Sequence, residues 1–115
     1  MSIRESLNVM RERSPILQDV HQGDWEAFVD YFCIHPMVWR YFVKFAVQAR
    51  AKGKKRYSAD SLMHRVRWEC EIEGGEEEYK INNNHVSVFV ILLAAKTPDF
   101  VDFFEFRVLR KKEAA

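Results

Sequence analysis

Long apolar runs, targeting signals and metal-ligand clusters are all missing from this 115-residue chain. Its longest apolar run covers residues 88–95, whereas a membrane-spanning helix needs about 20 such residues. The first residues, MSIRESLNVMRERS, contain no apolar segment of the kind that a signal peptide has. We therefore expect no contact with a membrane and a location in the cytoplasm.

Cysteine is scarce as well. Cys33 and Cys70 each lie in an apolar pattern without the spacing of a metal site, so we expect free thiols rather than a disulfide, as in a reducing compartment. No two of the four histidines are separated by four residues, and no carboxylate or thiolate motif adds ligands to them. We expect no metal and no cofactor.

The common enzyme motifs are also absent. The chain has no phosphate-binding glycine loop, no nucleophile elbow and no Cys/His pair of known spacing. Glu69, Glu71 and Glu73 alternate along an expected helix and so point in different directions, which favours an acidic helix end over an acid–base pair. The sequence therefore predicts a protein that is not an enzyme.

Positive and negative charges nearly cancel, with 18 Lys and Arg against 17 Asp and Glu. Any binding of nucleic acid must therefore depend on where the charges lie. The densest basic cluster is RAKGKKR, at residues 50–56. Cations suit the negative end of a helix dipole, so a solvated helix end is the simpler interpretation of this cluster. Contact with the phosphates of a nucleic acid is the alternative that implies a specific function.

Apolar and aromatic residues are plentiful, at 48% and 14% of the chain, and their spacing predicts helices. Three or four helices are expected from spacing and caps: 25–32 after Asp24, Pro36 to just before Gly53, 59–72 after Ser58, and 85–96 after the asparagines 82–84. The last contains VSVFVILLA, which is rich in β-branched residues and would also suit a buried strand.

Short strands are expected at Tyr57, over 79–81 and over 104–109, the last from its alternating pattern. This order of elements predicts an α+β fold, mostly α and winged-helix-like, with a helix-turn-helix beside a two- or three-stranded sheet. One compact domain is expected over 24–110, after an N-terminal arm or short docking helix (1–23) and before a basic frayed tail (111–115). The expected core comprises Phe28, Val29, Phe32, Trp39, Phe42, Val43, Ala46, Leu62, Val66, Phe89, Leu93, Phe103, Phe104 and Phe106.

In such a fold the basic residues would cluster near one edge, and residues 82–85 would occupy the exposed N-terminus of the recognition helix, where a phosphate or a base edge could be met. The expected nucleic-acid-binding residues are Lys52, Lys54, Lys55, Arg56, Arg65, Arg67, Asn83, Asn84 and His85. Against this, Ser87 is nearly the only polar residue between His85 and Lys96, and a helix that is apolar all round is normally buried. Either the core envelops this helix or its surface meets another protein.

Three segments, KKRYSADSLMHRVRW, YKINNNHVSVF and TPDFVDFFEFRVLRK, together resemble the pattern of a small phage- and prophage-encoded family of uncharacterised proteins. The likeness covers roughly residues 25–111 and implies a bacterial host cell as the setting, with no established activity. This chain departs from the family after the asparagines, where the family carries polar and basic residues. At these positions this chain has the apolar residues Val86, Val88, Phe89, Val90 and Ile91. This difference favours an apolar surface that binds a partner protein or a second copy of the chain.

Two functions fit these patterns. The first is a small non-enzymatic nucleic-acid-binding or regulatory protein of phage type. The second is a protein–protein interaction module that binds and inhibits a host protein, such as a defence or replication factor, through the acidic stretch 69–78 and the apolar helix. A homodimer fits either function, because nine Phe and three Trp are many for one chain of this length to bury.

Overall fold

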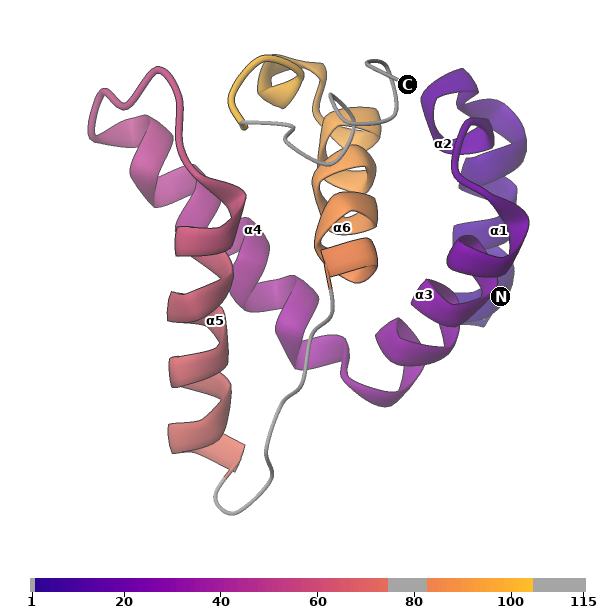
Figure 1. The fold of residues 1–115 in the computed structure, drawn as a ribbon, viewed down its shortest axis with the longest axis horizontal. Helices are drawn as coiled ribbons and strands as arrows, with labels where there is room; N and C mark the ends of the chain where they lie inside the picture. Colours follow the sequence, from indigo (N-terminus) through magenta and orange to yellow (C-terminus); the bar gives the residue numbers. More distant parts are fainter. Residues whose placement is uncertain (1, 75–82, 105–115) are drawn as a thin grey trace.

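The computed structural model of the chain describes residues 2–74 and 83–104 (Figure 1). Within these ranges the chain forms α-helices joined by short turns. The helices are α1 (Ile3–Arg13), α2 (Pro15–Gln18), α3 (Gln22–Ile34), α4 (Pro36–Ala51), α5 (Ala59–Gly74) and α6 (Asn83–Lys96), followed by the 3-10 helix η1 (Pro98–Phe100).

The predicted winged-helix-like α+β fold is wrong, because the described residues form an all-helical globule without a sheet. Tyr57 makes only an isolated parallel bridge to Phe104. It lies between a turn and the first residues of α5, so too little extended backbone is present for a ladder. The strand expected over 79–81, and residues 105–109 of the last one, lie outside the described residues.

The helix α6 is the centre of the molecule, with α1–α3 on one side and α4 and α5 on the other (Figure 1). From Val86 to Ala94, every side chain except Ser87 is buried. The prediction of a helix over residues 85–96 is confirmed, and the alternative of a buried strand is wrong. Helices α2, α3 and α5 and the turn η1 all pack against α6, so each of its faces meets apolar side chains. Its apolar faces therefore lie in an enveloping core.

Phe89 on α6 is fully buried at the middle of an aromatic cluster. Ring centroids 4.9–6.5 Å from its own belong to Phe28, Tyr31, Phe32, Trp39 and Phe42. Aromatic pairs at such distances contribute about 0.5–1.5 kcal/mol beyond the area they bury. These five rings of α3 and α4 thus find an aromatic partner on α6.

The predicted core is confirmed for most of its described members. Trp39 and Val43 are only half-buried, and Phe106 lies outside the described residues. The helix α4 is rotated slightly from the predicted orientation, so that its inward stripe consists of Val38, Phe42, Phe45 and Ala46.

Most helix ends were predicted correctly from the capping residues in the sequence. Pro36 is the first residue of α4, and the Ser58 hydroxyl accepts the backbone N–H of Ser61 at 3.3 Å at the start of α5. The prediction of Asp24 as an N-cap is wrong. His21 caps α3 instead, because its Nδ1 accepts the backbone N–H of Gly23 at 3.2 Å. Asp24 then falls in the first turn, where its charge still suits the helix dipole.

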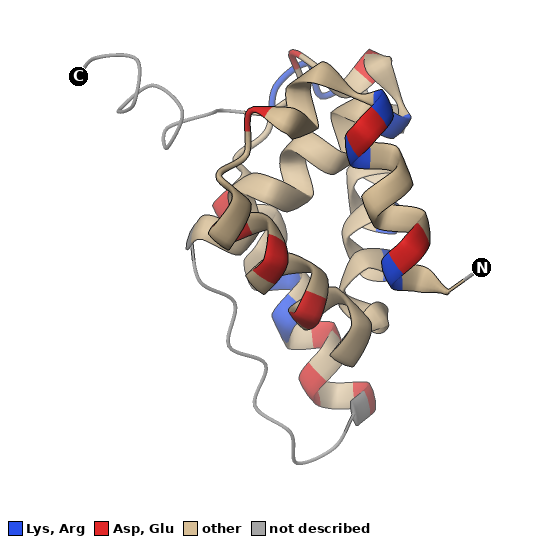
Figure 2. Cartoon of the chain, turned by 90° about the vertical axis from the view of Figure 1, so that its right-hand side faces the viewer, with Lys and Arg blue, Asp and Glu red and all other residues tan. Residues whose placement is uncertain are grey.

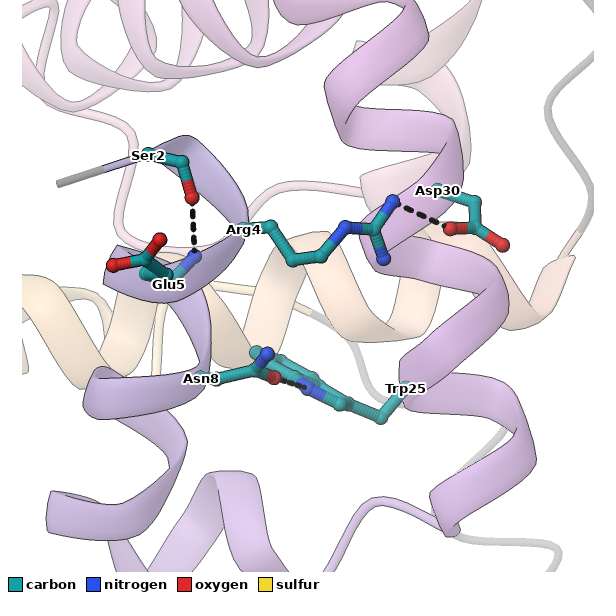
Figure 3. Close-up of polar contacts among 6 residues, drawn as sticks. All are labelled: Ser2, Arg4, Glu5, Asn8, Trp25 and Asp30. Atoms are coloured by element: carbon teal, nitrogen blue, oxygen red, sulfur yellow. Dashed lines mark hydrogen bonds and ion pairs between the residues drawn. The ribbon is translucent and has the colours of Figure 1, made fainter.

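The N-terminal helices are docked on the rest of the molecule. Leu7 of α1 and Leu17 of α2 are buried in the common core. The indole Nε1 of Trp25 donates to Asn8 Oδ1 at 2.8 Å (Figure 3). In the same view Arg4 forms an ion pair with Asp30 at 2.8 Å, which ties α1 to α3. Of the two alternatives for this segment, the docked helix is the one observed.

Candidate functional site

Four exposed cations follow one another in the turn between α4 and α5. We call residues 52–56 the basic turn; its cations Lys52, Lys54, Lys55 and Arg56 form no ion pair with any other described residue. The turn begins with a Schellman motif, in which the N–H of Gly53 donates to the Arg50 carbonyl at 3.0 Å and that of Lys54 to the Ala49 carbonyl at 3.2 Å. Gly53 has a φ of 90°, which glycine adopts without strain.

The far end of the basic turn is fixed to the segment that follows α6. The backbone N–H of Tyr57 donates to the Phe103 carbonyl at 2.8 Å, and the two rings stack with centroids 6.4 Å apart. Arg50 pairs with Asp99 at 3.2 Å and lies over the Phe100 ring. The basic turn is therefore held rigidly next to the C-terminal end of α6.

An open hollow of about 360 Å³ adjoins the basic turn. It is lined by Lys55, Arg56, Asp102 and Phe104. Because Asp102 lies beside two of the cations, part of their positive charge is compensated inside the hollow.

The expected nucleic-acid-binding residues do not form one cluster. Asn84 and His85 lie at the N-terminal end of α6, whereas the basic turn adjoins its other end (Figure 1). Since α6 has 14 residues, the two groups are about 20 Å apart along its axis. Asn83 is the first residue of α6. The sequence did not indicate which end of α6 lies beside the turn.

His85 is a packed residue rather than a surface one. Its ring lies against Tyr31 of α3, with centroids 4.8 Å apart. Burial lowers the pKa of His85 from its ordinary value, and the carboxylate of Asp24 opposes this shift. The imidazole is therefore placed to pack between α6 and α3.

The two arginines of α5 are also engaged with their surroundings. Arg65 lies 4.0 Å above the Phe45 ring and donates to Gln48 Oε1 at 3.3 Å, so it joins α5 to α4. Arg67 is half-buried. Of the nine expected residues, the four cations of the basic turn are the ones that the structure brings together.

The C-terminal end of α5 is acidic. In Figure 2 the blue segment of the basic turn lies at the top, and the red segments at the end of α5 lie at the bottom. A hydrogen bond to Glu73 is the main reason why the pKa of Tyr41 is raised to about 12. Burial, followed by the charges of neighbouring carboxylates, raises the pKa of the Cys70 thiol to about 11. Because α5 has 16 residues, its basic and acidic ends are about 24 Å apart.

Sequence reasoning missed the apolar residues on the outside of α5. Trp68 is 63% exposed and Ile72 is 59% exposed. Both fall outside the buried stripe of this helix, to which the predicted core residues Leu62 and Val66 belong. Two large apolar side chains four residues apart and off that stripe were the signal that could have found them.

Among the described residues, no group of three or more His, Cys, Asp or Glu is placed to hold a metal ion. Cys33 and Cys70 are free thiols, half-buried and buried respectively. Nor is any helix in the described part of the chain long and apolar enough to cross a membrane.

Comparisons with known proteins found no similar protein. No family model matches the chain, and neither the curated proteins nor the solved structures include a match. The resemblance to a phage-encoded family therefore stays a prediction.

Proposed function

We propose that this protein is a small non-enzymatic nucleic-acid-binding protein whose basic turn contacts the phosphate backbone. The observation that carries the proposal is the row of four exposed cations within five residues, Lys52, Lys54, Lys55 and Arg56. Like charges so closely spaced repel one another in the free protein. Duplex DNA offers a negative charge about every 1.7 Å of its axis and is a matching partner.

Phosphates rather than bases are the expected contact. Sequence is read in the major groove by polar side chains on a helix or ribbon that enters it. The helix α6 is buried from Val86 to Ala94 and is not available for that role. The basic turn is a rigid loop end, fixed by its Schellman motif and by the hydrogen bond from Tyr57 to Phe103. A rigid loop of this kind supports binding that depends weakly on base sequence and strongly on salt.

Neighbouring carboxylates set an upper limit on the affinity. Asp99 compensates Arg50, and Asp102 lines the hollow with Lys55 and Arg56. About three or four phosphate contacts remain, so the slope of log affinity against log salt is expected to be about −3 to −4. Such a protein binds weakly at physiological salt unless more than one copy contacts the same strand.

A salt titration of duplex binding tests the proposal. Fluorescence anisotropy is measured with a labelled duplex of about 20 base pairs, for the natural chain and for the triple variant Lys54→Ala, Lys55→Ala, Arg56→Ala. We expect the triple variant to bind at least about tenfold more weakly at low salt and to lose up to about three units of slope.

The matched control removes the same charge elsewhere, through Arg13→Ala, Arg40→Ala and Lys44→Ala, all exposed positions outside the turn and away from the end of α6 beside it. It should keep the natural affinity and slope. Equal loss in both triple variants would mean that net charge alone drives binding. No loss in the basic-turn variant would exclude this turn as the contact.

The second candidate function is binding and inhibition of another protein, such as a defence or replication factor of a bacterial host. It is supported by the exposed Trp68 beside carboxylates, since Trp is enriched among the residues that dominate interface energies. Parallel purifications from host lysate with the natural chain and with Trp68→Ala test it. A host protein retained only by the natural chain, and inhibited by it in the host protein's own assay, is expected; identical recoveries contradict the proposal.

A further inference from the structure

The side of α5 that faces away from the core carries an apolar patch. Trp68 and Ile72 are four residues apart, so they adjoin on one face of the helix, and both are more than half exposed. The opposite, inward stripe consists of Ala59, Leu62, Met63, Val66 and Cys70. We call the exposed side the outer face of α5, defined by Ser61, His64, Trp68 and Ile72.

The charges that border the outer face change sign at Trp68. Arg65 and Arg67 precede it, and Glu69 and Glu71 follow it. Residues four apart share a side of a helix, so Arg65 and Glu69 border one edge of the outer face, and Arg67 and Glu71 border the other. Each edge therefore has a cation before the tryptophan and a carboxylate after it.

This order is complementary to itself in one orientation only. A second α5 that runs antiparallel presents the reverse order, so each cation meets a carboxylate along both edges. A parallel copy would place like charges opposite each other, which is destabilising. A wholly basic helix from another protein would suit the carboxylates and oppose the two arginines. Charge complementarity thus favours a second copy of this chain as the occupant.

We propose that two copies of this protein associate through the outer faces of α5, antiparallel about a twofold axis at Trp68. The same patch is used by both copies, as a twofold interface requires. The two Trp68 side chains meet at the centre, and Ile72 of each copy packs beside His64 of the other. Unlike charges line both edges.

Association through this face is weak. A contact along one side of a 16-residue helix falls short of the roughly 800 Å² per partner of a standard stable interface. Each arginine also stands four residues before a carboxylate of its own helix, at the spacing of an intrahelical pair, so the ionic gain on association is small. The tryptophan contact supplies most of the affinity, and the dimer dissociates on dilution.

The dimer sets the distance between its two basic turns. The use of that distance for binding a duplex is the only step that rests on the proposed function. Arg56, at the end of the basic turn, precedes Trp68 by 12 positions. Only nine of these positions are helical, since α5 begins at Ala59, so at 1.5 Å per residue on each side of the axis the two α5 N-termini are about 27 Å apart along the helices, and the basic turns lie beyond them. Successive half-sites on one face of duplex DNA are separated by about 34–36 Å. The two basic turns of a dimer are therefore close enough for one duplex to contact both.

Light scattering and sedimentation over about 1–500 µM protein, without nucleic acid, test the dimer. The natural chain is expected to pass from monomer to dimer in this range. Trp68→Ala should raise the dimer dissociation constant by at least about tenfold. Val47→Ala, which truncates another half-exposed apolar side chain on α4, should change it by less than about twofold. A monomer at every concentration, or a dimer insensitive to Trp68→Ala, overturns the proposal.

A mixing experiment tests the antiparallel arrangement. One chain carries Arg67→Glu and the other carries Glu71→Arg, so each has charges of a single sign along one edge of the outer face. Arg65 is kept in both chains because it joins α5 to α4. Each alone is expected to stay monomeric, with its helical circular dichroism spectrum unchanged, and the mixture to form a heterodimer. A mixture that stays monomeric while the natural chain dimerises overturns this arrangement. A basic partner protein captured by a monomeric natural chain identifies a different occupant.

The two proposals fail separately. Lys54→Ala, Lys55→Ala, Arg56→Ala leaves the outer face intact and is expected to dimerise normally. Trp68→Ala leaves the basic turn intact and is expected to bind a duplex with a lower apparent affinity, because one turn contacts it instead of two. Dimerisation without duplex binding overturns only the proposed function, and duplex binding by a strictly monomeric natural chain overturns only the dimer.

Discussion

His85 lies where the first turn of α6 packs against the end of α3, and its burial links protonation to stability. The pKa of His85 is lowered by burial, so the folded state holds this imidazole neutral at pH values at which the unfolded chain already binds a proton. Where the unfolded state binds more protons, stability rises with pH. This contribution is complete above the ordinary pKa of 6.5 and is lost as the pH falls from there towards the folded-state pKa.

We therefore predict that the urea midpoint of the natural chain falls between about pH 7.5 and pH 5.5 more than that of His85→Gln, which cannot take up the proton. The comparison with the variant at both pH values isolates this group from the carboxylates, which titrate mainly at lower pH. An equal fall in both proteins would show that His85 does not carry the dependence.

At the scale of elements, the turn at Gly53 illustrates what local sequence determines. Its φ of 90° is costly for any residue with a Cβ. We predict that Gly53→Ala lowers the free energy of unfolding by about 1–2 kcal/mol and loosens the basic turn. Thermal unfolding followed by circular dichroism measures the change.

Gly23 is the matched control for this substitution. It lies in the first turn of α3 without a positive φ, and a Cβ there would approach His21 no closer than 3.4 Å. Gly23→Ala should be neutral or stabilise the protein by up to about 1 kcal/mol. Two Gly→Ala changes of opposite sign are thus expected, and equal effects would contradict the role of the φ angle at residue 53.

Helix ends and buried stripes were predictable because their causes are local. Pro36, Gly53 and Ser58 act within one turn of chain, and the stripe of α5 follows from residue spacing alone. Long-range placement was not predictable in the same way. Residues near Phe103 and Phe104 could pair in a sheet or pack as a turn, and only contacts with the distant Tyr57 decide between them.

The same distinction between local and long-range causes applies to the candidate site. The cations of the basic turn were evident from the sequence, since four of its five residues are Lys or Arg. Their distance from Asn84 and His85 was not, because it depends on which end of α6 adjoins the turn. The exposure of Trp68 was overlooked because an aromatic residue on a helix is more often a core residue.

At the scale of the whole molecule, the N-terminal helices are part of the core, and adjacent residues of α2 test this. Leu17 is fully buried, whereas its neighbour Ile16 is 42% exposed. We predict that Leu17→Ala lowers the free energy of unfolding by about 2–5 kcal/mol, because it removes apolar contacts and leaves a cavity. Ile16→Ala should change it by less than about 0.5 kcal/mol. Urea unfolding of the two variants makes the comparison, and similar effects would mean that α2 is only loosely attached.

The central position of α6 has a consequence for biosynthesis. Of the α-helices in the described residues, this one leaves the ribosome last, yet the earlier ones, α2, α3 and α5, need it as their packing partner. Until residue 96 has emerged, the rings of Phe28, Phe32 and Phe42 lack the neighbour on which they converge. A nascent chain in that state exposes apolar surface that chaperones recognise and that aggregates readily. Folding of this protein is therefore expected to start late in translation and to proceed in one cooperative step.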